Sequence, residues 1–306
     1  MADPTLGVVV MAYGTPATQD DIEAYYTHIR RGSAPSADQL AELTARYDAI
    51  GGTSPLAERT EAQRAAIQSA LDARAPGRCR VVLGQKHAAP FIEDAVASLA
   101  DDGVHHIVGL VLAPHYSRFS VGQYQERLAA AAKARSVPAS GIDSWHLEPT
   151  YLGFLTEAVE EAMAGLPTET KVLFTAHSLP ERVLVDDPYP DQLRQSATAV
   201  AQAAGLNRWA GWSLCWQSAG RTPEPWRGPD VLTVIRELAA TGRAEGILVC
   251  PQGFVSDHLE VVYDLDVEAS AVADEVGLAF ARTRVLNAEP AVMGTLADRV
   301  LVAAPS

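Results

Sequence analysis

Residues 171–183, KVLFTAHSLPERV, contain an apolar run that ends at His177 and continues into a Ser-Leu-Pro turn. A continuous run rich in β-branched and aromatic residues is typical of a strand that is buried on both faces of a parallel sheet. Ligands of such sheets bind beyond the carboxyl ends of the strands, and His177 stands at such an end. Many loop histidines have only a hydrogen-bonding role, so a functional role for His177 needs further evidence from the rest of the sequence.

The chain contains a second copy of this arrangement. Residues 7–16, GVVVMAYGTP, match residues 171–180 as an apolar run, an alanine, a polar ring and a proline three residues later, which places Tyr13 at the position of His177. Each copy is followed by helical segments, a second strand (79–84 or 208–216), a helix that begins near a proline (Pro90 or Pro229) and a third strand (106–114 or 246–254). The period is too long for a solenoid repeat. We therefore expect two similar α/β domains that face each other across a cleft.

Length and composition agree with two folded domains. The chain has 306 residues, of which 48% are hydrophobic, which is enough for two cores. Residues 137–150 have poor helix periodicity and two prolines, so we expect an N-terminal domain of residues 1–145 and a C-terminal domain of residues 146–306, with the last helix able to pack back on the first domain. No apolar stretch is long enough to span a bilayer and no basic region precedes the first strand, which predicts a cytoplasmic protein.

Charge and cysteine content exclude several classes of function. The formal net charge of −14 argues against a nucleic-acid partner, because nucleic-acid binding depends on Lys and Arg that neutralise phosphates. The three cysteines, Cys79, Cys215 and Cys250, are odd in number, lie in or next to predicted strands and form no C-x-x-C pair. We expect packed thiols, and neither a structural zinc site nor an iron–sulfur cluster held by four cysteines.

Two charged regions have open interpretations. Arg30, Arg31, Arg46 and Arg59 either pair with nearby acids on a solvated surface or bind an anionic ligand, and the spacing does not decide between them. Residues 256–277 have a helical apolar stripe, formed by Val262, Leu265, Ala269, Val272 and Val276, and a line of acids, Glu260, Asp264 and Glu268. The line is either an exposed acidic face, with Asp257 as N-cap and Glu260 as its capping-box partner, or a path for a divalent cation next to His177.

Eight co-linear segments resemble the ferrochelatases, in particular the soluble bacterial coproporphyrin ferrochelatases. The segments are MAYGTP (11–16), YYTHIRRG (25–32), LTARYDAIGGTSPLAERT (43–60), GQKHAAPFIEDAV (84–96), LAPHYSRFSVGQY (112–124), TAHSLPERV (175–183), WQSAGRTPEPWRGPD (216–230) and GFVSDHLEVVYDLDVEA (253–269). The resemblance extends over essentially the whole length of the chain. The resemblance implies two Rossmann-like domains of the chelatase type, each with a parallel sheet flanked by helices, which enclose a porphyrin cleft.

The resemblance also implies roles for individual residues. His177 and Glu260 match the catalytic pair that meets iron and the pyrrole protons, and Tyr13 matches a tyrosine that faces the metal from the other side of the ring. The positions that match porphyrin-propionate binders are Arg30, Arg46, Tyr47, Ser54 and Tyr124. An outer metal-binding line, with room for a divalent cation, is matched by Asp264, Glu268 and His87. Iron(II) and porphyrin are the implied substrates, and no prosthetic group is expected.

Two features favour coproporphyrin III as the substrate, with Fe-coproporphyrin III (coprohaem) as the product. Tyr13 stands where the resemblance leads us to expect Met in enzymes that use protoporphyrin, and the polar segment GSAPSADQLAEL (32–43) offers no apolar lip for entering a membrane. The alternatives are a protoporphyrin IX ferrochelatase, a haem or porphyrin carrier that binds without metalating, and a cobalt or nickel chelatase. We expect a monomer with transient partners in the haem pathway and no stable membrane association.

Overall fold

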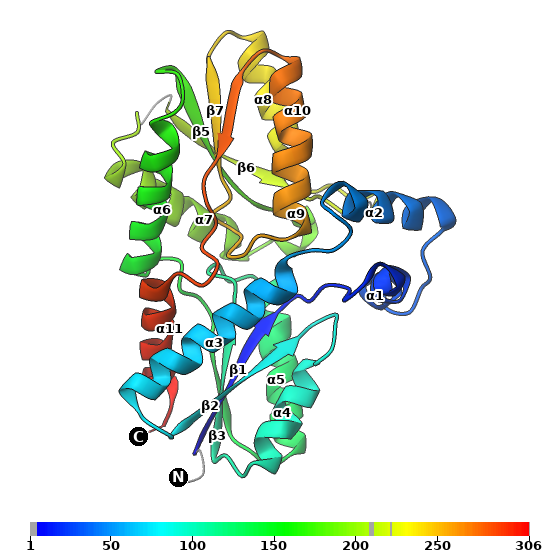
Figure 1. Ribbon diagram of the computed structural model, residues 1–306, viewed down its shortest axis with the longest axis vertical. Helices are drawn as coiled ribbons and strands as arrows, with labels where there is room; N and C mark the ends of the chain where they lie inside the picture. The colour runs from blue at the N-terminus through cyan, green and yellow to red at the C-terminus, as the bar shows by residue number, and fades with distance from the viewer. Residues whose placement is uncertain (1–4, 208–210, 221, 306) are drawn as a thin grey trace. The chain divides into compact units, whose positions relative to one another are not determined.

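The computed structural model describes residues 5–207, 211–220 and 222–305, and the chain divides into two compact units (Figure 1). Unit 1 consists of Met1–Pro114, Arg118–Trp145 and Asn287–Ser306, and unit 2 of His115–Ser117 and His146–Leu286. The C-terminal segment thus belongs to unit 1 by its contacts, although it follows unit 2 in the chain. The domain boundary at 145/146 stays a prediction.

Unit 1 is built on a four-stranded parallel sheet in the order β2-β1-β3-β4. Its strands are β1 (Leu6–Ala12), β2 (Cys79–Gln85), β3 (His106–Val111) and β4 (Ala139–Ile142). Its helices are α1 (Ile22–Ile29), α2 (Ala37–Ala49), α3 (Leu56–Arg74), α4 (Ile92–Asp101), α5 (Gln123–Ala134) and α11 (Pro290–Ala303). Helices α4 and α5 pack on one face of the sheet and α3 and α11 on the other, so every residue of the central strand β1 is buried (Figure 1).

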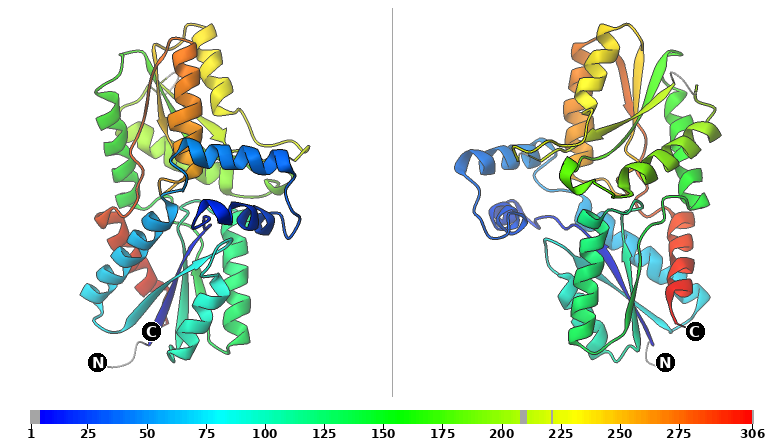
Figure 2. Two further views of the ribbon diagram at one scale, coloured as in Figure 1. Left: turned by 45° about the vertical axis from the view of Figure 1, so that its right-hand side comes forward. Right: turned by 180° about the vertical axis from the view of Figure 1, so that it is seen from behind.

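Unit 2 repeats this architecture with the strand order β6-β5-β7-β8, again all parallel. The strands are β5 (Thr170–His177), β6 (Trp212–Gln217), β7 (Gly246–Cys250) and β8 (Ala279–Arg282). The helices are α6 (Pro149–Met163), α7 (Tyr189–Ala203), α8 (Val231–Ala240), α9 (Leu259–Val261) and α10 (Ser270–Glu275), with a π-helix, η4 (Val262–Ala269), between the last two. Figure 2 shows α8 and α10 on one face of this sheet and α6 and α7 on the other.

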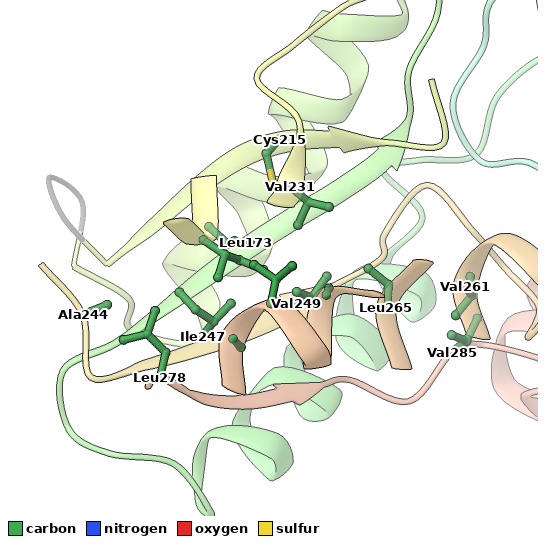
Figure 3. Packing of buried hydrophobic residues seen from close by; sticks show 14 residues of the cluster. Leu173, Cys215, Val231, Ala244, Ile247, Val249, Val261, Leu265, Leu278 and Val285 are labelled. Carbon is green, nitrogen blue, oxygen red and sulfur yellow. The ribbon is translucent and has the colours of Figure 1, made fainter. Parts of the chain in front are cut away.

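One hydrophobic core of unit 2 lies between the sheet and the helices α8, η4 and α10 (Figure 3). Leu173 of β5, Ile247 and Val249 of β7 and Leu265 of the π-helix are fully buried in it. Burying a side chain of this size stabilises a fold by about 1.5–3 kcal/mol each. This packing holds the π-helix, and the residues just before it, against the strands that end at His177.

The predicted α/β class with two similar parallel sheets is confirmed, and several boundaries need correction. The strands predicted at 106–114 and 246–254 end earlier, at Val111 and Cys250. The strand predicted at 208–216 begins at Trp212 in the structure. Residues 208–210 of this prediction, and Arg221 in the turn-rich segment 217–230, lie outside the described residues. The edge strands β4 and β8 were not predicted. Among the residues that the structure describes, no helix is long and apolar enough to cross a membrane.

Candidate active site

Strand β5 brings His177 to the end of the unit 2 sheet. Residues Val172 to Ala176 are buried, and His177, the last residue of the strand, is the first to become partly exposed. His177 pairs in register with Gln217 at the end of β6, and the amide of Ser178 donates to the Gln217 carbonyl over 2.8 Å. The imidazole therefore lies at the carboxyl end of a hydrogen-bonded central strand, and ligands of parallel sheets bind beyond such ends.

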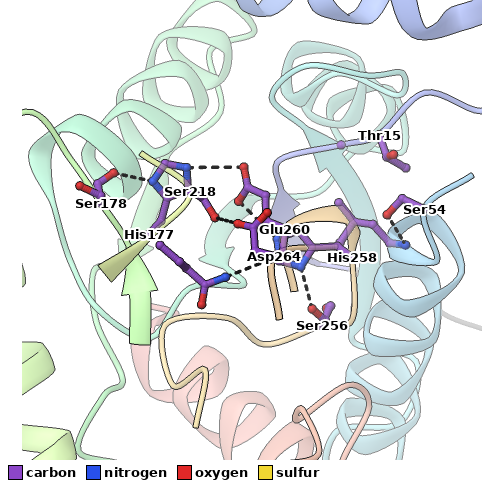
Figure 4. Close-up of polar contacts among 12 residues, drawn as sticks. Thr15, Ser54, His177, Ser178, Ser218, Ser256, His258, Glu260 and Asp264 are labelled. Carbon is purple, nitrogen blue, oxygen red and sulfur yellow. Dashed lines mark hydrogen bonds and ion pairs between the residues drawn. The ribbon is translucent and has the colours of Figure 1, made fainter. Parts of the chain in front are cut away.

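The His177 imidazole faces the Glu260 carboxylate (Figure 4). His177 Nε2 lies 3.5 Å from Glu260 Oε1, and His177 Nδ1 lies 2.5 Å from the Ser178 carbonyl oxygen, which can only accept a hydrogen bond. With Nδ1–H donating to this carbonyl, the contact with Glu260 is attractive when Nε2 also carries a proton. Burial alone would lower the pKa of His177, but the Glu260 carboxylate and the bond to Ser178 raise the pKa to about 9.

A second imidazole, His258, contacts the other oxygen of the same carboxylate. His258 Nε2 lies 3.5 Å from Glu260 Oε2, and its Nδ1 donates to the Ser256 carbonyl oxygen at 2.9 Å (Figure 4). Burial would raise the pKa of Glu260, but the two imidazoles hold that pKa well below its usual range. His258 was not predicted as a site residue, although it lies two positions before Glu260 in the segment DHLE.

Asp264 is a second carboxylate that acts on His177. Its side chain is buried and accepts a hydrogen bond from the Ser218 hydroxyl, and its charge also raises the pKa of His177. Ser218 has a φ of 57°, a left-handed conformation that is uncommon outside glycine, directly after β6. The neighbouring Gln217 amide donates to the Glu260 carbonyl over 2.9 Å. The turn after β6 thus holds both acids, and neither Gln217 nor Ser218 was predicted to contribute.

The segment that carries these acids differs from the predicted single helix. It is one turn of α-helix followed by the π-helix η4, whose i→i+5 bonds often occur at functional sites. Val261, and not the predicted Val262, is buried in the core. The alternative in which Asp257 is the N-cap is also wrong, because His258 occupies the cap position and Asp257 forms an ion pair with Arg282. The Glu260 side chain is consequently available to the two histidines.

In unit 1, the residue that corresponds to His177 contacts one of the predicted outer metal ligands. Tyr13 follows β1, is 43% exposed, and its ring centre lies 4.6 Å from that of His87. His87 Nδ1 lies 3.0 Å from His28 Nδ1, so one of these nitrogens donates to the other. Burial, with the positive charge of Lys86 second, lowers the pKa of His87 to about 3. His87 is therefore neutral. Its grouping with Asp264 and Glu268, which belong to unit 2, stays a prediction.

The predicted propionate binders have a mixed local environment. Arg30 donates from Nε to the Ser33 carbonyl oxygen over 3.1 Å and lies over the ring of Tyr26. Tyr47, Ser54 and Tyr124 are buried, and each has a contact within unit 1: the Tyr47 hydroxyl with Thr15, the Ser54 hydroxyl with the Leu56 amide, and the Tyr124 ring with the Lys86 ammonium. Arg46 lies in the last turn of α2. Their role toward a porphyrin stays a prediction.

No resident metal centre is built into the part of the chain described here: no three or more His, Cys, Asp or Glu side chains of these ranges form a group that could hold a metal ion. The three cysteines are free and buried, as predicted for packed thiols.

The two similar parallel sheets define a chelatase-type fold. SirB from Bacillus subtilis, in a structure with Fe3+, superposes with a TM-score of 0.59 over 98% of this chain and 96% of its own, at 13% identity. CbiX, described as the terminal enzyme for biosynthesis of sirohaem in denitrifying bacteria, superposes with a TM-score of 0.56 over 99% of this chain and 100% of its own, at 15% identity. Likeness at such low identity shows the fold alone.

Sequence comparison gives the family. The chain belongs to the ferrochelatase family, whose family model, "Ferrochelatase", matches residues 5–303. The coproporphyrin III ferrochelatase of Geobacillus kaustophilus is 45% identical over 98% of this chain and 96% of its own length. That of Bacillus subtilis is 42% identical over 98% of both chains. The resemblance inferred from the eight segments is confirmed.

Proposed function

We propose that this protein is a coproporphyrin III ferrochelatase, a lyase of haem biosynthesis that inserts iron(II) into coproporphyrin III. The observation that carries the proposal is the Glu260 carboxylate held between His177 and His258 at the strand ends of unit 2. Membership of the ferrochelatase family and 45% identity to a coproporphyrin III ferrochelatase support the substrate assignment. The monomeric state and the cytoplasmic location stay predictions.

The reaction requires bases. Iron(II) replaces two protons on the pyrrole nitrogens of the free porphyrin, so the balanced step releases two protons for each metal inserted. At neutral pH the His177–Glu260 pair already holds one proton, because the His177 pKa is raised to about 9. The pair can accept a pyrrole proton only after this first proton has left.

The arrival of iron would remove that first proton. A divalent cation beside Glu260 offsets the carboxylate charge that keeps His177 protonated, so the imidazolium becomes a stronger acid. His177 then has a free Nε2 that either accepts a pyrrole proton or briefly ligates the metal. Asp264, held by Ser218, is the next acceptor, with Glu268 beyond it as the outer end of the relay. The loss of the proton from His177 is therefore coupled to the arrival of the metal ion.

Coproporphyrin III carries four carboxylates, which need cationic and hydroxyl partners. We assign these contacts to Arg30, Arg46, Tyr47, Ser54 and Tyr124, and we assign to Tyr13 the contact with the macrocycle on the face opposite His177. The exposure of the Tyr13 ring supports its assignment. The buried state of Tyr47, Ser54 and Tyr124 means that their hydroxyls reach a ligand only if the surrounding side chains move.

The test is an anaerobic insertion assay with iron(II) and either coproporphyrin III or protoporphyrin IX, followed by the change from free-base to metalloporphyrin absorbance. We expect rapid conversion of coproporphyrin III, and binding without conversion in His177→Ala. Preference for protoporphyrin IX would refute the substrate assignment. Binding of either ring without metalation by the unmodified protein would identify a carrier, and conversion with cobalt or nickel alone would identify a different chelatase.

A further inference from the structure

Arg282 of strand β8 forms ion pairs with the acidic segment 257–275. Seven acids and no Lys or Arg lie between Asp257 and Glu275. Arg282, the last residue of β8, brings a positive charge to two of these acids. Its Nε and Nη2 donate to the two oxygens of Asp266 over 2.6 and 2.9 Å, and its Nη2 also lies 3.0 Å from Asp257 Oδ1. One guanidinium thus joins two carboxylates that are nine positions apart in the sequence.

Arg282 is well placed to hold a fixed geometry. Its backbone pairs with Val249 of the buried strand β7, and its Nη1 donates to the Thr283 carbonyl oxygen over 3.2 Å. The Arg282 side chain is only 19% exposed, so these ion pairs are screened less than ordinary surface pairs. The planar fork of arginine, bidentate on Asp266, restricts direction as well as distance, which lysine cannot reproduce.

The segment between the two clamped carboxylates contains Glu260, the candidate catalytic carboxylate, and Asp264, the next acid of the proposed relay. Buried Val261 and Leu265 hold this stretch against the core of unit 2, but its backbone is irregular. Helix α9 is a single turn without a side-chain cap, and the π-helix that follows is a rare conformation. The position of the Glu260 side chain therefore depends also on what fixes the two ends of this stretch.

We propose that Arg282 is a positioning residue for metal insertion, which clamps segment 257–266 so that Glu260 stays between its two histidines. The clamp also offsets the charges of Asp257 and Asp266, so a divalent cation is attracted to Glu260 and Asp264 and not to Asp257 or Asp266. The inference rests on the proposed function, because it assigns Arg282 a part in that reaction. Arg282 acts through Glu260 and does not touch the substrate.

Arg284 provides a matched control. It lies two residues beyond Arg282, pairs with Glu161 over 2.9 Å and with Glu157 over 3.6 Å, and packs on the ring of Phe154, all on helix α6. Arg282→Lys should lower kcat for iron insertion by about 10- to 100-fold, since small misplacements of a reacting group have effects of this size. Its KM for porphyrin should stay within about twofold of the original, and Arg284→Lys should leave both constants within about twofold.

A double variant separates positioning from a general structural role. If Arg282 acts through Glu260, then Arg282→Lys should lower kcat by less than about twofold in a Glu260→Gln background. A full, additive loss in that background would overturn the proposal. Asp266→Asn, which keeps Arg282 paired with Asp257, should show a smaller loss of kcat than Arg282→Lys and provides the test if Arg282→Lys folds poorly. An Asp266→Asn variant with unchanged kcat would also contradict the clamp.

Amide hydrogen exchange tests the clamp without any assay of activity. In protein free of porphyrin, Arg282→Lys should raise the exchange rate of residues 258–269, while exchange in α6 stays unchanged, and Arg284→Lys should leave residues 258–269 unaffected. Equal exchange in the original protein and Arg282→Lys would overturn the proposal. If the unmodified protein metalates no porphyrin, the proposed function fails, but the exchange result still decides whether Arg282 holds this segment.

Discussion

Replacing Glu260 with glutamine gives the sharpest test of the His177–Glu260–His258 arrangement. Glutamine has nearly the same shape, so the variant should fold, but it removes the negative charge that faces both imidazoles. His177 Nε2 and His258 Nε2, each 3.5 Å from a carboxylate oxygen, would then face an uncharged amide. The His177 pKa should fall toward 6.5, because the carboxylate is the largest influence that raises it.

The size of the effect follows from the structure. A rise of the His177 pKa from 6.5 to about 9 corresponds, at full value, to roughly 3 kcal/mol. Because 35% of the His177 and 33% of the Glu260 side-chain surface is exposed, solvent screening reduces this interaction to about 1–2 kcal/mol. The raised pKa stabilises the fold fully below pH 6.5, and this contribution is lost as the pH rises toward 9. Glu260→Gln should lack that pH dependence.

The assay combines kinetics with titration. We expect kcat for iron insertion to fall by about 10²- to 10⁴-fold in Glu260→Gln, the range for a contribution to acid–base catalysis, because the neutral amide neither attracts the divalent cation to His177 nor accepts a proton; porphyrin affinity should be unchanged. NMR of the histidine rings reports the His177 pKa directly. Asp274→Asn, which removes an exposed carboxylate near the end of α10, is the charge-matched control and should change neither quantity. A Glu260→Gln enzyme with kcat within about threefold of the original, or with the His177 pKa still near 9, would refute the reasoning.

Three further predictions concern other residues. Ser218→Ala leaves the buried Asp264 without its hydroxyl partner, so the free energy of unfolding should fall by about 1–3 kcal/mol and kcat several-fold, measured by urea titration and the insertion assay; no loss in either would show that the bond has no role. Burial lowers the pKa of His115 well below 6.5, so the unfolded chain binds the extra proton and stability should fall by about 1.4 kcal/mol per pH unit below pH 6.5. His115→Gln should reduce that slope in urea titrations at pH 5.5 and 7.5, and an unchanged slope would contradict this assignment. Burial raises the pKa of Cys250 to about 12, so iodoacetamide at pH 8 should modify this thiol only in unfolded protein, as mass spectrometry would show; labelling of the native fold would contradict it.

The order of the main elements was predictable because their signals are local. Strands β1 and β5 are continuous apolar runs that end at a polar ring and a proline, and such runs indicate buried parallel strands without knowledge of the rest of the fold. Strands β4 and β8 carry no such signal. Their sequences, ASGI and AFAR, are short and partly exposed, and they become strands by pairing with the buried β3 and β7.

The site was predictable only in part, because its remaining contacts depend on the tertiary structure. The resemblance to the ferrochelatases pointed to His177 and Glu260, but the interpretation of residues 256–277 assumed regular helix periodicity, which the π-helix breaks. His258 was missed because its imidazole reaches Glu260 only in the turn that precedes α9. Arg282 was missed because it lies outside the acidic stretch and reaches it from a strand that was itself not predicted.

The two copies of the strand-end motif have opposite electrostatic environments. Beside Tyr13 in unit 1, the pKa of His87 falls to about 3 and that of Lys86 to about 8, in both cases through burial first and then neighbouring positive charge. At His177 in unit 2, carboxylates raise the imidazole pKa against the effect of burial. Positively charged side chains therefore neighbour this position in unit 1, and carboxylates neighbour it in unit 2. Such a pair suits a reaction with two oppositely charged substrates, a tetracarboxylate porphyrin and a divalent cation, although the chain as a whole carries a formal charge of −14.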